Sequence, residues 1–184
     1  REGRDLPITC DGAIAHGVMT LEQAAQTFVF REVPEPPVPS LNRGFSAPIK
    51  LVANISADDL RFLAAKDADP FNRWQALQTL STRLLVDNAA AARTGNALRI
   101  DGGLVEALAA VLADGSLEPA FVALMLTLPG ESDIAREIGR DVDPDAIFKA
   151  RSALRAALGE RLAAPLFDHY RRLSEPRPYR PDAD

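Results

Sequence analysis

The spacing at which apolar residues recur changes near residue 53, and this change limits the possible folds more than any other feature. Before it, the run Thr27–Phe30 is β-branched and aromatic, which predicts a strand. In residues 47–53, Ile49 and Leu51 alternate with Lys50, which predicts a second strand. After residue 53 the period is 3.6 residues, which predicts amphipathic helices. We therefore expect a mainly helical chain with strands confined to its first third.

A proline-rich connection separates the two predicted strands. Proline fixes φ and has no backbone N–H, so residues 34–40 should be extended and polyproline-like, outside any ladder. Its prolines are Pro34, Pro36, Pro37 and Pro39.

Helix starts are marked by capping residues. Ser56 with Asp59 three residues later resembles a capping box and predicts a helix that ends near Lys66. Asp69-Pro70 and Asp143-Pro144 place aspartate at the cap and proline at the first helical position. These signals predict helices from 70 to about 92 and from 143 to about 173.

Three further helices are expected between these two. One follows Asp101 and stops at Gly115, and one spans 132–138. The third starts at residues 116–119 and is apolar nearly all round, which predicts burial on several sides. In the last long helix, Gly159 and Pro165 are expected to introduce a bend. The proline-containing tail 174–184 should be irregular.

The predicted helices follow one another as short antiparallel hairpins. The starts near Ala57 and Asp101 are about 44 residues apart, close to the period of HEAT-like repeats, although no residue pattern recurs at that period. We therefore predict a mainly α fold: an irregular HEAT-like helical-hairpin array, or α-solenoid.

Charge and apolar content exclude several classes of protein. The 184 residues carry 21 Lys+Arg against 26 Asp+Glu, a net charge of −5, so we expect no nucleic-acid partner. The apolar stretch 120–126 is too short to span a bilayer and no secretory leader opens the chain, so we expect no membrane association. A single cysteine, Cys10, cannot form an internal disulfide. Cytoplasm is the expected location.

Acidic and histidine-containing motifs do not form a convincing catalytic or metal site. Asp141, Asp143 and Asp145 alternate as in a calcium loop, but Ala146 and Ser152 replace its required glycine and glutamate. These carboxylates are better explained as helix-capping groups.

Other local motifs also have ordinary explanations. Asp168-His169-Tyr170 are neighbours in a helix, so they point in different directions and cannot form a relay. His16 has no second ligand near it, and Gly102-Gly103 lacks the spacing of a dinucleotide fingerprint. Asn54-Ile55-Ser56 matches a glycosylation acceptor, but Ser56 is better explained as a cap. The arginines Arg171, Arg172, Arg177 and Arg180 are expected at a solvated helix end. We predict no catalytic, metal or substrate-binding residue.

Two longer blocks carry a family resemblance. The run Pro37–Leu51 strongly resembles the segment that ends the β-sandwich domain of bacterial aminopeptidase N, a family of gluzincin-type zinc aminopeptidases. The run Asp69–Ala76 is similar to the helix that opens its C-terminal helical domain. The likeness extends from about residue 11 to 170. Asn42 departs from it, because an apolar residue is expected there.

The resemblance implies a fragment of a larger cytoplasmic enzyme, in keeping with an N-terminus that looks cut from something longer. Residues 1–53 would be the C-terminal part of a β-sandwich linker domain, and residues 54–184 the N-terminal part of the helical domain. Family members remove N-terminal amino acids from peptides with zinc, using an H-E-x-x-H helix and a G-x-M-E-N loop. Neither motif occurs here, so we expect this chain alone to bind no zinc and to be inactive.

The resemblance also implies a structural role, in which this part bounds the cavity that admits peptides. The implied partners are peptide substrates, through the parent enzyme, and the missing catalytic domain. Incomplete domains would expose strand edges and apolar faces, so self-association is a further hypothesis. The alternatives are a free-standing HEAT-like protein-binding module and, less favoured, an autonomous hydrolase.

Overall fold

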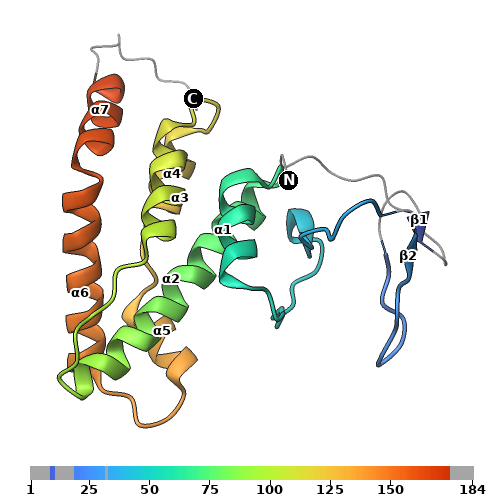
Figure 1. The fold of residues 1–184 in the computed structure, drawn as a ribbon, viewed down its shortest axis with the longest axis horizontal. Helices are drawn as coiled ribbons and strands as arrows, with labels where there is room; N and C mark the ends of the chain where they lie inside the picture. Colours follow the sequence, from blue (N-terminus) through green and yellow to red (C-terminus); the bar gives the residue numbers. More distant parts are fainter. Residues whose placement is uncertain (1–8, 11–18, 32, 175–184) are drawn as a thin grey trace.

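The chain forms seven helices and one short strand pair within the part that the structure describes, residues 9–10, 19–31 and 33–174 of a computed structural model (Figure 1). This confirms the mainly helical prediction. The elements are β1 (Thr9–Cys10), β2 (Phe30–Arg31), the 3-10 turn η1 (Arg43–Phe45), α1 (Ala57–Lys66), α2 (Pro70–Arg93), α3 (Gly102–Ala113), α4 (Pro119–Met125), α5 (Glu131–Ile138), α6 (Pro144–Arg161) and α7 (Ala163–Leu173).

The predicted capping residues begin four of the helices. Ser56 Oγ accepts a hydrogen bond from the Asp59 backbone N–H at 3.1 Å, as a capping serine should. An aspartate carboxylate accepts in the same way at the start of each of three further helices: Asp69 in α2, Asp101 in α3 and Asp143 in α6. Each bond satisfies a backbone donor that the first turn of a helix leaves free.

The core surrounds α2, which packs against α1 on one side and α6 on another and also contacts α3, α4 and α5 (Figure 1). Its apolar stripe predicts this position, because Leu77 and Leu85 are almost completely buried. Helices α3, α4, α5 and α6 each add apolar side chains that are at most 2% exposed: Leu104, Val111, Leu112, Val122, Met125, Ile134, Ile147 and Leu154.

The expected strand at 47–53 is wrong. The Ile49 N–H donates to Ala47 O at 2.9 Å, a tight turn around Pro48, and residues 50–56 belong to no helix and no ladder. Ile49 is 53% exposed and Val52 86% exposed. Alternation yields a strand only when a partner covers its apolar face, and the described residues supply none.

The first predicted strand, at 27–30, is formed only at its end. Phe30 and Arg31 pair antiparallel with β1, with Cys10 opposite Phe30 and Thr9 opposite Arg31. Residues 34–40 are outside any ladder, as their prolines predict.

The last long helix, expected to be continuous with a bend at Gly159 and Pro165, is divided into two. Helix α6 ends at Arg161 and α7 begins at Ala163, because Pro165 has no N–H to bond the Arg161 carbonyl. Burial of α4 on several sides is wrong, since Val122 and Met125 are buried but Leu124 is 49% exposed. Residues 175–184 of the expected irregular tail lie outside the described part.

Candidate functional site

An open cleft of about 840 Å³ lies between the segment 39–55 and helices α1 and α2. Leu41, Leu51 and Ile55 line one side, and Phe71 and Trp74 of α2 line the other. Arg136 and Glu137 of α5 also border the cleft. Its walls are therefore mostly apolar, with charged groups at the margin.

Aromatic rings connect this cleft to a smaller hollow of about 300 Å³. The Phe71 ring lies 5.2 Å from the Phe45 ring and 5.7 Å from the Trp74 ring, centroid to centroid. Phe71 and Trp74 form a wall shared by the cleft and the hollow, and Phe121 and Leu124 complete the hollow. The Trp74 Nε1 donor is buried there without a hydrogen-bond partner. This is an apolar packing surface with no reactive group in its wall.

Polar contacts hold the start of segment 39–55 against the corner between α1 and α2. Ser40 Oγ donates to Asp67 Oδ2 at 2.6 Å, and the Asp67 side chain is only 2% exposed. Asn72, which is 6% exposed, donates from Nδ2 to Ser40 Oγ at 2.7 Å and to the Leu41 carbonyl at 3.0 Å. The Gly44 N–H donates to Oδ2 of Asp69, the capping residue of α2, at 2.5 Å.

Asn42 closes the loop that makes these contacts. Its Oδ1 accepts from the Ala47 N–H at 2.9 Å and its Nδ2 donates to the Ala47 carbonyl at 3.1 Å. Its φ of 54° is left-handed, a conformation that asparagine tolerates better than most residues do. This explains an amide at a position where an apolar residue is expected from the family resemblance.

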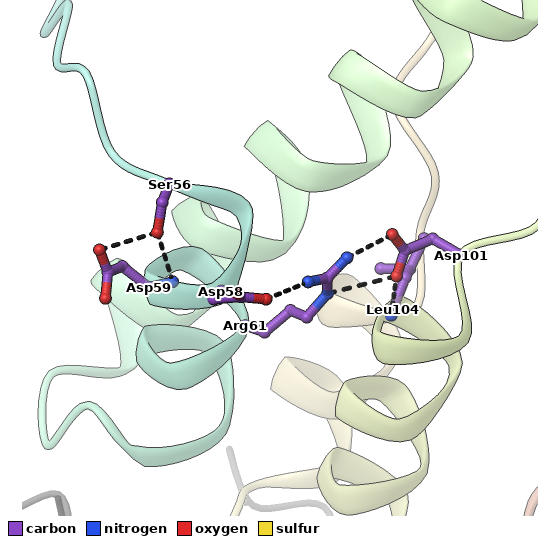
Figure 2. Close-up of polar contacts among 6 residues, drawn as sticks. All are labelled: Ser56, Asp58, Asp59, Arg61, Asp101 and Leu104. Atoms are coloured by element: carbon purple, nitrogen blue, oxygen red, sulfur yellow. Dashed lines mark hydrogen bonds and ion pairs between the residues drawn. The ribbon is translucent and has the colours of Figure 1, made fainter.

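An ion-pair cluster joins α1 to α3 (Figure 2). Arg61 lies between the two helices, with Nη1 2.5 Å from Asp58 Oδ1 and Nη2 2.6 Å from Asp101 Oδ2. Asp101 also caps α3 by accepting from the Leu104 N–H at 2.8 Å. Burial opposes ionisation of Asp101, but the bonds from Arg61 and the helix N–H groups outweigh it and lower its pKa. One carboxylate therefore both caps a helix and pairs across an interface.

A buried arginine joins α2 to the ends of α1 and α3. Arg73 is 8% exposed, and its Nε donates to the Ala64 carbonyl at 3.1 Å while its Nη1 lies 3.0 Å from Asp114 Oδ2. Hydrogen bonding from Ser116, followed by that from Arg73, lowers the pKa of Asp114. Neither this cluster nor the one at Arg61 was expected from the sequence, because the partners are about 40 residues apart. The only local signal was the Asp-Gly-Gly start of α3.

The sequence motifs that contain histidine or several acids do not assemble into a site. His169 Nδ1 lies 3.1 Å from Arg172 Nη2, which also donates to the Leu112 carbonyl, so this group connects α7 to α3. Tyr170 is 66% exposed and has no role in that contact. Asp143 acts as a cap, as predicted. His16, the Cys10 side chain, Arg177 and Arg180 lie outside the described part.

Within the part of the chain that the structure describes, no three His, Cys, Asp or Glu side chains gather as metal ligands would. Across the same residues, no helix combines the length and apolar character needed to cross a bilayer.

Two family models cover the chain. Residues 57–184 match a domain of unknown function, DUF3458_C, described as ARM repeats. The chain belongs to this family. Residues 1–54 match a second domain of unknown function, DUF3458, described as an Ig-like fold. The helical-array prediction and the prediction of a sandwich-type N-terminal segment agree with these descriptions.

Curated relatives are bacterial proteins named Aminopeptidase N. The chain is 37% identical to the one from Escherichia coli over 169 residues, which are 92% of this chain and 19% of that protein. It is 39% identical to the one from Caulobacter vibrioides over 170 residues, 90% of this chain and 18% of that protein. The chain thus spans about a fifth of the length of these relatives, and the expected resemblance to bacterial aminopeptidase N is confirmed.

A solved structure has the same fold. It is the crystal structure of Legionella pneumophila aminopeptidase A in complex with aspartic acid, with a TM-score of 0.70 and 24% identity. The match covers 86% of this chain and 18% of that one. At this identity the likeness concerns the fold alone.

Proposed function

We propose that this chain is a non-catalytic portion of a larger zinc aminopeptidase of the cytoplasm, which removes N-terminal amino acids from peptides. The observation that carries the proposal is the 37–39% identity to two proteins named Aminopeptidase N over at least 90% of the chain. The helical array would serve as a scaffold that bounds the cavity through which peptides reach a catalytic domain.

The residue inventory supports a scaffold and not a catalytic unit. The two histidines, His16 and His169, are far apart in the sequence, so no H-E-x-x-H helix can form. In the described residues, the ion pairs of Arg61 and Arg73 are used to join helices. The aromatic cleft offers an apolar packing surface and no nucleophile or base.

Immunodepletion of the source lysate tests the parent enzyme. An antibody raised against this chain should detect a band several times heavier than 19.9 kDa. Depletion with it should remove activity against aminoacyl-methylcoumarin substrates, and a chelator should abolish the activity of the captured protein. A band at 19.9 kDa alone, with activity left in the lysate, would contradict the proposal and favour a free-standing protein-binding module.

The purified 184-residue chain tests the non-catalytic role. After incubation with zinc and desalting, we expect less than stoichiometric metal by elemental analysis and no hydrolysis of the same substrates. Hydrolysis by the chain, sensitive to a chelator, would instead make it an autonomous hydrolase.

A further inference from the structure

Residues 40–47 belong to one matched family segment and contact the other. They lie within residues 1–54, which match the Ig-like family, whereas their contacts lie at the start of residues 57–184, which match the ARM-repeat family. We propose that this loop is a rigid joint that fixes the C-terminal end of the Ig-like segment against the first two helices of the array. The inference rests on the contacts themselves and not on the proposed function.

The first support is the burial of the carboxylate that receives the loop. The Asp67 carboxylate is 2% exposed and receives the Ser40 hydroxyl on Oδ2 and the Asp69 N–H, at 2.8 Å, on Oδ1. The Arg43 guanidinium lies 3.6 Å from Asp67 Oδ1 and supplies an opposite charge. A buried carboxylate that loses such partners is strongly penalised, so separation of the loop from the corner is costly.

The second support is the number of directions from which the loop is held. Asn72 binds Ser40 and Leu41, Gly44 N–H binds Asp69, and the Phe45 ring packs on Phe71. A flexible linker would be joined to its neighbour through the chain alone. Side-chain, backbone and aromatic contacts on successive residues restrict rotation as well as separation.

The third support is the backbone conformation of the loop. Asn42, Gly44 and Phe45 all have left-handed φ values of 54°, 63° and 52°. Such a conformation is unfavourable for phenylalanine and persists only where the surrounding contacts over-determine it. The loop is therefore held in one shape by Asn42 from within and by α1 and α2 from outside.

The joint has a consequence for any larger protein that contains both segments. The C-terminal end of the Ig-like segment and the first helices would move together, so a change in the opening of a cavity bounded by them would be produced at another boundary.

Hydrogen exchange of the full 184-residue chain tests the joint directly. In the wild type, amides of residues 44–47 should be protected to a degree similar to the first turn of α2. Ser40→Ala and Asn72→Ala should each raise exchange in this loop by about tenfold, the effect of losing one or two buried hydrogen bonds. Exchange in α3 and α6 should stay unchanged.

Two controls accompany these variants. Ser40→Thr keeps the hydroxyl and should retain protection. Gln78→Ala removes a hydrogen bond from the same helix α2 to the Thr127 carbonyl, away from the joint, and should leave the loop protected. If Asn72→Ala raises exchange in every helix, Ser40→Ala decides the result, since Ser40 lies outside the helices. Unprotected loop amides in the wild type would overturn the proposal.

A distance measurement tests the rigid-body consequence. Spin labels are attached at Lys50→Cys and Glu160→Cys in a Cys10→Ser background. The first label lies just after the loop, and the second lies at an exposed position of α6. The wild-type distance distribution should be narrow and should broaden with Asn72→Ala but not with Gln78→Ala. A broad distribution in the otherwise wild-type chain, or no broadening with Asn72→Ala, would overturn the proposal.

Discussion

Gly103 of α3 lies against a residue of α1, Arg61, that is about 40 positions away in the sequence. A Cβ added at this position would lie 2.2 Å from the Arg61 Nε atom, whereas one added at Gly102 would meet nothing within 4 Å. Arg61 is held there by Asp58 and Asp101. The absence of a side chain at Gly103 thus allows α1 and α3 to be joined by an ion pair.

Gly103→Ala should displace the Arg61 guanidinium group from Asp101. Alanine favours a helix by up to about 1 kcal/mol over glycine, so Gly102→Ala should be neutral or stabilising. We expect Gly103→Ala to be about 1 kcal/mol less stable than Gly102→Ala because it disrupts a partly exposed, charge-assisted contact. Urea denaturation followed by circular dichroism measures both, and equal stability of the two variants would contradict the assigned role.

The ion pair of Asp101 should make stability depend on acid pH. Its pKa is lowered in the folded state, so its contribution is complete above the unfolded value of about 4 and is lost as pH falls through the folded pKa. Asp101→Asn keeps a good helix cap but loses the charge. The variant should be about 0.5–1 kcal/mol less stable than wild type at pH 7.

The same comparison repeated at lower pH checks the sign. The stability difference between wild type and Asp101→Asn should shrink as pH falls below about 4 and through the lowered folded pKa of Asp101, because the wild-type carboxyl then loses its charge. Added salt should also reduce the difference at pH 7. A difference that stays constant over the whole pH range would show that charge is not responsible.

Two aspartates at the start of α6, Asp143 and Asp145, should differ in how much they stabilise the helix, because only Asp143 caps it. Asp143 accepts a hydrogen bond from the Ala146 N–H at 3.0 Å, while Asp145 lies in the first turn of α6 as an acidic residue. Asp143→Ala should cost about 1 kcal/mol of unfolding free energy through loss of the cap. Asp145→Ala should cost only about 0.3 kcal/mol through the helix dipole. Thermal denaturation of both variants tests this, and the reverse order would be inconsistent with a cap at Asp143.

The strand prediction at 47–53 is wrong, whereas most of the helix predictions are confirmed, because the two kinds of element depend differently on neighbouring segments. A helix satisfies its backbone bonds internally, so a cap such as Asp69 and a stripe that includes Leu77 suffice to predict it. A strand needs hydrogen bonds from a second segment. Ile49 and Leu51 have the right alternation, but the described part of the chain contains no strand that pairs with them.

In the molecule as a whole, stability should depend on the packing of other helices around α2. Leu154 of α6 has no exposed surface, and Leu124 of α4 is 49% exposed. Leu154→Ala should cost about 2–5 kcal/mol because it leaves a cavity in the core. Leu124→Ala should change the unfolding free energy by about 0.5 kcal/mol or less, as most surface substitutions do.

Urea denaturation distinguishes the two leucine variants. If Leu124→Ala were as destabilising as Leu154→Ala, the exposed face of α4 would have to be buried by association. Repeating the denaturation at several protein concentrations would then reveal the association, because the stability of an associated form depends on concentration.

Much of the candidate site could not be predicted from sequence, for one physical reason. Asp67, Asn72 and Ser40 are unremarkable residues of a cap, a helix and a loop, and their chemistry depends on which groups lie within 3 Å. In the sequence, Arg73 is part of a predicted helix and of a family motif, and neither feature predicts its buried ion pair with Asp114. Long-range partners of this kind are fixed by helix packing, which local patterns do not encode.

The sequence by itself determined most of the helices, the caps at Ser56, Asp69, Asp101 and Asp143, and the family likeness, because propensity, capping and apolar period act over a few residues. Tertiary structure alone decided that residues 47–53 are not a strand, that Gly103 accommodates Arg61, and that the loop of residues 40–47 packs against the corner between α1 and α2. These outcomes depend on contacts between residues about 25 to 40 positions apart, which exist only after α1, α2 and α3 have packed.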